Sequence, residues 1–249
     1  MIELIDLETY CNELLDINAF QDYCPNGLQV DAGRSEVRKI VTGVTASQAL
    51  IDAAITAEAD LLLVHHGYFW KGESEPLKGI KGRRVRTLMQ AGISLLAYHL
   101  PLDAHSQFGN NRQLAEKLGF STAIPSKEGL IWQIDLEQPL DANELAVRIA
   151  KALGQQPMHI SIGDKPIRRI GWCSGGAQDY IESAAELGLD AFITGEISER
   201  TVHLARELGI HFYAAGHHAT ERFGVQALGK HLAERYELEH QFIDISNPA

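Results

Sequence analysis

The residues best suited to chemistry are two adjacent histidines, His65 and His66, which follow the aliphatic run Leu61 to Val64 and precede Gly67. A short apolar run of this kind predicts a strand buried inside a parallel sheet. Open α/β sheets bind their ligands at the carboxyl ends of such strands. Because side chains alternate along a strand, the two imidazoles are expected to project to opposite sides of its end and to serve two neighbouring metal ions. The alternative is one buried, hydrogen-bonded histidine beside an exposed one.

Two further histidines at predicted strand ends each have a carboxylate four residues on, His99 with Asp103 and His217 with Glu221. If a helix begins at His217, this spacing places that pair on one helix face. Pro101 is expected to exclude regular helix before it and to leave His99 and Asp103 on a loop.

Imidazole nitrogens and carboxylate oxygens together suit Fe, Zn, Mn, Co or Ni. One ion takes three or four protein ligands, so the candidate groups are too many for a single ion. They suit two divalent ions about 3.5–4 Å apart, which would activate a water for hydrolysis. The candidates are His65, His66, His99, Asp103, His217, His218 and Glu221.

The elements that position these groups predict an α/β fold. Strands are expected at 39–44, 61–66 and 93–99 with helices between them, which implies right-handed crossovers and mainly parallel, buried strands. A second αβ series begins after a helix whose start carries Asp141 and Glu144 in a capping-box pattern.

The second series repeats the first. Placing residues 40–66 over 170–196 without gaps aligns Asp60 with Asp190, together with the strand and helix patterns around them. Two amphipathic helices can give part of this match by chance, but strand, turn, helix and aspartate in register favour a duplication. Two half-sites from two similar lobes are then expected to converge across a pseudo-twofold axis.

The boundary between the lobes is predicted within residues 121–130. The first lobe, residues 1–124, carries His65, His66, His99 and Asp103. The second, residues 125–249, carries Glu196, His217 and Glu221, and the two lobes are expected to pack closely into one unit.

Three groups are candidates for proton transfer: His99, His218 and Glu196. Glu196 qualifies as a general base or outer-shell ligand because it lies where the second series mirrors His66. Ser174-Gly175-Gly176 links a strand to a helix and could present backbone N–H groups to an anion. Glycines are also what any tight strand-to-helix turn requires.

The residues that follow the histidine pair are candidates for substrate binding. Tyr68 and Trp70 could stack on a planar base, with Lys71 near a phosphate. The alternative is a loop that packs onto the protein's own surface or onto a neighbouring subunit, because exposed aromatics of this kind mark a contact or ligand surface.

Composition narrows the class of protein. The chain has 249 residues, 45% hydrophobic and 22% charged, typical of a globular protein. Its net charge of −11 disfavours nucleic acid as a partner unless a local basic face, for which 78–86 is the best candidate, overrides it. That segment is read first as a solvated helix face. Three widely spaced cysteines, with neither a signal peptide nor a membrane-length apolar run, predict a cytoplasmic protein.

As a set, five motifs resemble the Nif-three-like family, and in particular its short YbgI-type members, which are often labelled GTP cyclohydrolase 1 type 2 homologues. The resemblance covers essentially the whole chain and implies two linked α/β lobes, a dinuclear metal centre and a toroidal homohexamer. It implies His65, His66, Asp103, His217 and Glu221 as metal ligands, with His99 nearby. The motifs are Pro25-Asn26-Gly27-Leu28-Gln29-Val30, Val64-His65-His66-Gly67, His99-Leu100-Pro101-Leu102-Asp103, Thr194-Gly195-Glu196 and Gly216-His217-His218-Ala219-Thr220-Glu221.

The leading functional prediction is a metal-dependent hydrolase that acts on a non-peptide C–N bond of a cyclic amide or amidine, such as a nucleotide or heterocycle ring. The alternative is a non-catalytic, ring-shaped metal-binding scaffold or regulatory protein. A metal ion with an open coordination position that holds water favours the enzyme, and a metal ion whose coordination is completed by protein groups favours the scaffold.

Overall fold

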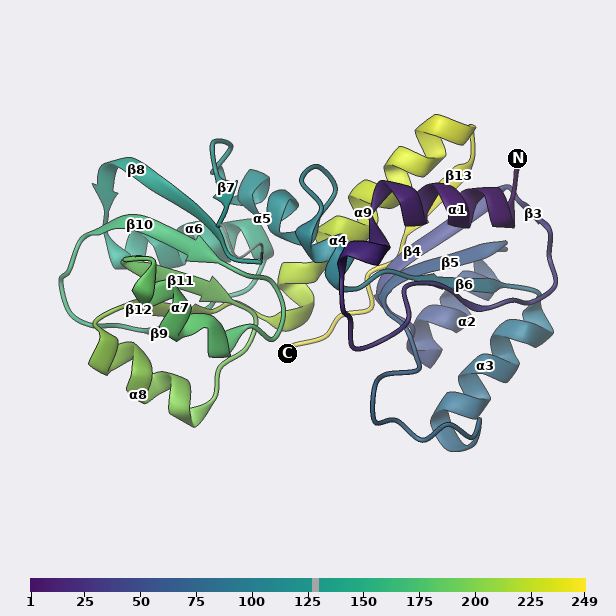
Figure 1. The fold of residues 1–249 in the computed structure, drawn as a ribbon, viewed down its shortest axis with the longest axis horizontal. Helices are drawn as coiled ribbons and strands as arrows, with labels where there is room; N and C mark the ends of the chain where they lie inside the picture. The colour runs from purple at the N-terminus through teal and green to yellow at the C-terminus, as the bar shows by residue number, and fades with distance from the viewer. Residues whose placement is uncertain (127–129) are drawn as a thin grey trace. The chain divides into compact units, whose positions relative to one another are not determined.

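The computed structural model describes residues 1–126 and 130–249, which form two compact α/β units (Figure 1). Unit 1 comprises Met1–Phe108 and Gly224–Ile245, and unit 2 comprises Gly109–Phe223 and Ser246–Ala249. Each unit contains a sheet whose three central strands are parallel and whose two faces are covered by helices. The predicted fold class is confirmed.

Unit 1 holds the first eleven elements, the later part of α9 and the last strand. In chain order these are β1 (Ile2–Glu3), α1 (Leu4–Leu14), η1 (Ile17–Ala19), β2 (Gly27–Val30), β3 (Glu36–Val37), β4 (Lys39–Thr45), α2 (Gln48–Thr56), β5 (Leu61–His66), α3 (Gly79–Ala91), β6 (Ser94–Ala97), α4 (Leu100–Ala104), part of α9 (His217–Tyr236) and β13 (Glu239–Phe242).

Unit 2 holds the elements between α4 and the start of α9. These are α5 (Asn110–Leu118), β7 (Ile124–Pro125), β8 (Trp132–Leu140), α6 (Ala142–Leu153), β9 (Met158–Ile160), β10 (Ile167–Trp172), η2 (Gln178–Tyr180), α7 (Ile181–Glu186), β11 (Ala191–Thr194), α8 (Glu199–Leu208) and β12 (His211–Ala214).

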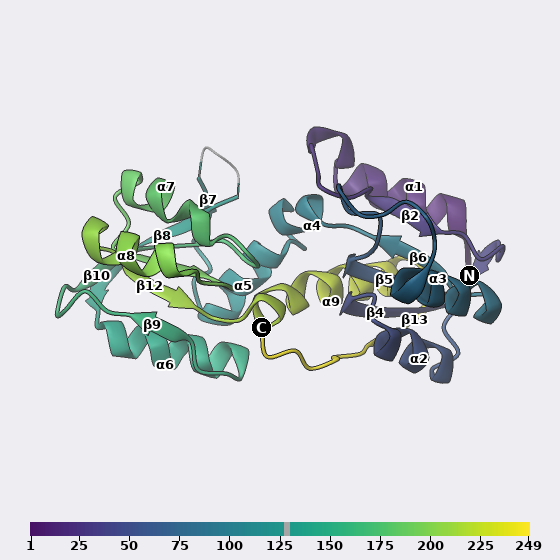
Figure 2. The same ribbon diagram turned by 90° about the horizontal axis from the view of Figure 1, so that it is seen from below.

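The sheet of unit 1 has the strand order β13-β4-β5-β6-β2, and only β2 is antiparallel to its neighbour. Alternation along β5 divides its side chains between two cores. Leu61 and Leu63 pack with α1 and the later part of α9, whereas Leu62 and Val64 pack with α2 and α3. Figure 2 shows these helices around the strands of this sheet. The run of aliphatic residues is therefore explained by a strand that is buried on both faces.

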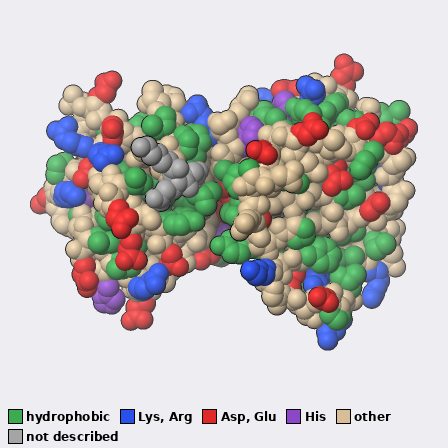
Figure 3. Space-filling view, in the orientation of Figure 1, with side chains coloured by type: hydrophobic (Ala, Val, Ile, Leu, Met, Phe, Trp, Pro, Cys, Tyr) green, Lys and Arg blue, Asp and Glu red, His purple; other side chains and the backbone are tan. Residues whose placement is uncertain are grey.

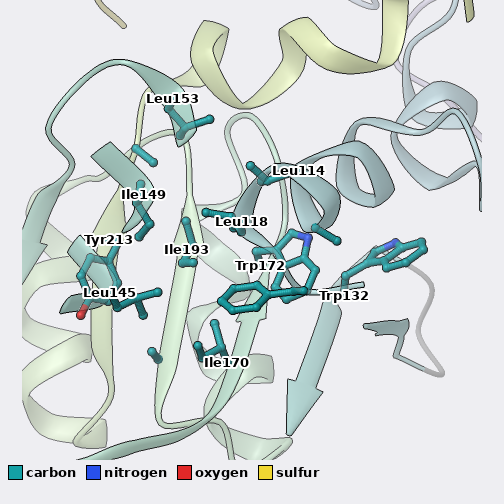
Figure 4. Close-up of a cluster of buried hydrophobic side chains, with 14 of the residues drawn as sticks. Leu114, Leu118, Trp132, Leu145, Ile149, Leu153, Ile170, Trp172, Ile193 and Tyr213 are labelled. Atoms are coloured by element: carbon teal, nitrogen blue, oxygen red, sulfur yellow. The ribbon is translucent and has the colours of Figure 1, made fainter. Parts of the chain in front are cut away.

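The sheet of unit 2 has the order β7-β8-β10-β11-β12-β9. One face packs against α5 and α6, around Trp172 and Ile193 (Figure 4). The indole N–H of Trp172 donates to the carbonyl oxygen of Asn111 at 3.0 Å, so this fully buried side chain has its polar atom satisfied. The predicted capping box of Asp141 and Glu144 is present at the start of α6.

The two aspartates that the ungapped alignment matches, Asp60 and Asp190, make similar hydrogen bonds. The Oδ2 atom of Asp60 accepts from the backbone N–H groups of Arg38 and Lys39 at 2.8 and 3.0 Å. At the equivalent place in unit 2, Oδ2 of Asp190 accepts from two consecutive backbone N–H groups at 2.9 and 3.0 Å, those of Arg168 and Arg169. In each unit one aspartate thus ties the start of the second central strand to the start of the first.

The units do not divide at the boundary predicted within residues 121–130. Strand β13 pairs with β4, so the C-terminal region belongs to the first sheet. Helix α5 contributes Leu114 and Leu118 to the core around Trp172, so it belongs to the second unit. Of the predicted linker, residues 127–129 lie outside the described residues.

On the face shown in Figure 3, acidic, basic and apolar side chains are interspersed. Among the helices formed by the described residues, none combines the length and apolar character needed to cross a lipid bilayer.

Candidate metal centre

The first donor set lies in unit 1 at the carboxyl end of β5. One ligand atom from each of His65, His66 and His99 lies within 4.8 Å of the others. The ring centroids of His65 and His66 are 4.6 Å apart, so the two imidazoles lie side by side. The rings are therefore closer together than the expected projection to opposite sides of the strand implies.

Each of these three histidines has a hydrogen-bond partner at Nδ1. The Nδ1 atom of His65 donates to the carbonyl oxygen of Tyr98 at 2.9 Å, and that of His66 lies 3.1 Å from Oγ1 of Thr45. The Nδ1 atom of His99 lies 2.6 Å from a carboxylate oxygen of Asp22. A metal-ligating histidine characteristically uses one ring nitrogen in this way, which fixes the ring and presents the lone pair of Nε2 to the metal.

Asp103 completes the set, with its Oδ1 atom 3.6 Å from Nε2 of His65. It lies on α4 (Leu100–Ala104), with His99 in the preceding N-cap position. The expectation of a loop here was wrong. Pro101 lies in the first turn of the helix, where a backbone N–H has no intrahelical partner and its absence costs nothing.

Asp22 was not found from the sequence, because it lies outside any periodic segment. Its carboxylate accepts from Nδ1 of His99 and from the backbone N–H of Leu100 and the side chain of Asn26, the last two at 2.9 Å. Burial raises the pKa of Asp22, but the hydrogen bonds from His99, Asn26 and the N–H of Tyr23, with the charge interaction with His99, outweigh it and lower the pKa to about 2. Asp22 is therefore a fixed negative charge that orients His99.

The second donor set lies in unit 2, where α9 begins at His217. The four-residue spacing brings Nε2 of His217 to 3.0 Å from Oε2 of Glu221, and Nδ1 donates to Glu196 at 2.7 Å. Burial lowers the pKa of His217, but the two carboxylates outweigh it and raise the pKa to about 9. Two carboxylates around one imidazole favour a cation at this place, whether a proton or a metal ion.

The turn at Gly175 makes room for this set. A Cβ atom on Gly175 would lie 2.0 Å from Oε1 of Glu221 and 3.2 Å from Nε2 of His217, and its φ of +70° also favours glycine. The N–H of Gly175 donates to Oγ1 of Thr220 at 3.0 Å, and those of Ser174 and Ala177 also donate to protein side chains. These three N–H groups are therefore used in holding a tight strand-to-helix turn, which is the second of the two interpretations of this segment, rather than in binding an anion.

The three predicted substrate-binding residues in the aromatic loop after His66 have different surroundings. Tyr68 is buried in the core of unit 1 and its hydroxyl donates to the carbonyl oxygen of Ala46 at 2.7 Å. Trp70 lies 4.9 Å from His99 and 5.9 Å from His66 between ring centroids. Lys71 is exposed. Of the three predicted substrate-binding residues, Trp70 is the one that contacts the donor set.

The residues present fit divalent transition metals. Unit 1 brings together His65, His66, His99 and Asp103, and unit 2 brings together Glu196, His217 and Glu221. His218 is buried in the first turn of α9. Imidazole and carboxylate donors whose own partners are in place are the ligands that Zn, Fe, Mn, Co and Ni share.

The sequence matches known proteins over nearly its whole length. Two relatives are both described as "GTP cyclohydrolase 1 type 2 homolog". The one from Pseudomonas aeruginosa is 55% identical and is matched over 100% of this chain and 99% of its own length. The one from Vibrio cholerae is 56% identical over 98% of each chain.

A solved structure described as protein ybgI, of unknown function, superposes with a TM-score of 0.95 and 52% identity over 100% of both chains. The family model for Duf34/NIF3 (NGG1p interacting factor 3) matches residues 2–248. The chain therefore belongs to the Duf34/NIF3 family.

Proposed function

We propose that this protein binds two divalent transition-metal ions and hydrolyses a C–N bond in a cyclic amide or amidine, such as the ring of a nucleotide or another heterocycle. The observation that carries the proposal is the pair of donor sets, one in each unit, in which histidines held at Nδ1 are accompanied by carboxylates. The printed name of the relatives, which refers to GTP cyclohydrolase, supports this class of substrate.

In the proposal, His65, His66 and Asp103 hold one ion, and His217 and Glu221 hold the other. Bound there, divalent ions would supply Lewis acidity, polarising a carbonyl or C=N group and acidifying a water molecule. The sequence-based prediction that both ions belong to one dinuclear centre is tested by the EPR spectrum of the Mn²⁺-loaded protein, in which neighbouring ions show magnetic coupling.

The protein's own groups would handle the proton. Asp22 holds Nδ1 of His99, so His99 would take up or deliver a proton at Nε2. Glu196 and His218 are the alternative groups for this role. Trp70 would pack against a flat substrate ring, and Lys71 would meet a substrate phosphate.

The test combines metal analysis with substrate turnover. Glu221→Gln and Asp103→Asn keep side-chain shape and remove charge, so each should lose metal during dialysis against a chelator. Glu75→Gln, a change at an exposed glutamate in unit 1, is the matched control and should retain as much metal as the wild type. If both carboxylate variants keep two ions per chain, the ligand assignment is wrong.

Turnover is measured on a panel of cyclic amides and amidines that includes GTP. Ring opening that stops on chelation and returns with metal supports the hydrolase. Full metal occupancy without ring opening across the panel contradicts the hydrolase and supports the metal-binding scaffold.

The proposal extends to compartment and assembly. The three cysteines, Cys11, Cys24 and Cys173, are free and buried, which suits a reducing compartment, and we place the protein in the cytoplasm. We also propose a ring-shaped homohexamer, with a small molecule rather than nucleic acid as its ligand.

A further inference from the structure

One residue of the aromatic loop has an unusual backbone conformation. Among the described non-glycine residues, positive φ occurs at Asp16, Glu58, Phe69 and Glu237. The other three are acidic residues at helix ends. Phe69 follows strand β5 and has φ of 64°. Bulky residues rarely adopt this left-handed conformation, and it persists only where surrounding contacts enforce it.

Those contacts come from Glu73. Its Oε2 atom accepts from the backbone N–H groups of Phe69 and Trp70 at 3.0 and 3.2 Å. Its own N–H donates to the carbonyl oxygen of Trp70 at 2.9 Å. One glutamate thus holds the backbone on both sides of Trp70, and its charge strengthens the bonds that it accepts.

Lys81 in turn holds Glu73. Its Nζ atom lies 3.4 Å from Oε2 of Glu73 and 5.4 Å from the ring centroid of Phe69, and it also donates to the carbonyl oxygen of Ser74. The Lys81 side chain is 14% exposed and projects from α3, a regular helix. The loop conformation is therefore fixed to a rigid element.

The consequence is the position of Trp70. Its ring is edge-on to His99, with centroids 4.9 Å apart, and it also packs near His66. Its indole N–H donates to the carbonyl oxygen of Gly67 at 3.3 Å, so the polar atom of the ring is used inside the loop. Two imidazoles of the donor set are thereby covered by an apolar side chain whose position does not depend on a ligand.

We propose that Glu73 and Lys81 are positioning residues that hold Trp70 as a fixed wall over His66 and His99. The wall restricts rotation of the two imidazoles and blocks approach of water and chelators, so it slows the loss of a metal ion from this donor set. The inference rests on the metal binding proposed above, and it adds a role for three residues outside the ligand set.

The test uses Glu73→Gln and Lys81→Met, with Trp70→Ala as the variant that removes the wall and Glu75→Gln as the matched control in the same loop. The first measurement is acrylamide quenching of Trp70 fluorescence, obtained by subtracting the signal of the Trp70→Phe form of each protein. Glu73→Gln and Lys81→Met should increase this quenching, whereas Glu75→Gln should match the wild type.

The second measurement is the rate at which Co²⁺-loaded protein loses cobalt to excess chelator, followed by the visible absorption of the metal. The rate should rise several-fold in Glu73→Gln, Lys81→Met and Trp70→Ala and stay unchanged in Glu75→Gln. The inference is overturned if Glu73→Gln leaves both quenching and cobalt loss at wild-type values. If wild-type protein binds no cobalt, the proposed function fails, and quenching alone decides whether Glu73 positions Trp70.

Discussion

Asp22→Asn is the substitution whose effect the structure defines most closely. The Asp22 side chain is 5% exposed and accepts hydrogen bonds from His99, Asn26, Leu100 and Tyr23. An asparagine in the same place keeps one acceptor oxygen and turns an N–H₂ group toward donors. At least one buried donor then loses its partner.

Two estimates of the cost agree. The pKa of Asp22 falls from the usual 3.8 to about 2, and since one unit of pKa corresponds to about 1.4 kcal/mol, the charged form stabilises the folded state by roughly 2–3 kcal/mol. Leaving a buried donor unpaired costs about 1–3 kcal/mol. The free energy of unfolding is therefore expected to fall by about 2–3 kcal/mol.

The assay is urea unfolding of chelator-treated protein at pH 7, so that bound ions do not mask the loss. Asp31→Asn, at an exposed aspartate that accepts a local hydrogen bond from the N–H of Gly33, is the control and should cost under about 0.5 kcal/mol. The ¹⁵N NMR signals of His99 should show loss of its fixed tautomer. A change in unfolding free energy below about 0.5 kcal/mol for Asp22→Asn would refute the role given to this carboxylate.

Gly175→Ala should destabilise the protein by about 2 kcal/mol or more and weaken metal binding, because the added Cβ would displace the Glu221 carboxylate. Unfolding curves and metal titrations of the variant that match those of the wild type would contradict this. Burial, with the charge of His211, lowers the pKa of His159, so its contribution to stability is present above about pH 6.5 and is lost as the pH falls below that value. Calorimetry between pH 7.5 and 5 should show a smaller fall in Tm for His159→Gln than for the wild type, with no such difference for the exposed His203→Gln control. Light scattering should give six times the chain mass of 27.5 kDa, and a monomeric mass at micromolar concentration would refute the ring.

Elements with strong local signals were predictable from sequence. The run from Leu61 to Val64 has no polar residue, so it predicted a strand buried on both faces. Strand β5 is buried on both faces. The capping box of Asp141 and Glu144 depends only on residues three apart, and it was found for that reason.

What escaped prediction depends on contacts between distant segments. The pairing of β13 with β4 joins residues about 200 positions apart, and no local pattern encodes which sheet receives a late strand. Asp22 acts on His99 from 77 positions away and lies in an irregular segment. Pro101 was misjudged because its effect depends on its place in the helix, which the sequence pattern did not reveal.

The late position of β13 has a consequence for synthesis on the ribosome. All strands of unit 2 leave the ribosome before β13 does, so that unit can complete its sheet while unit 1 still waits for its last strand. Until then β4 has an unpaired edge, and Leu228 and Leu232 of α9 do not yet cover Leu61 and Leu63. The nascent first unit therefore presents an open strand edge and an apolar face, the features that chaperones bind and that lead to aggregation when translation stalls.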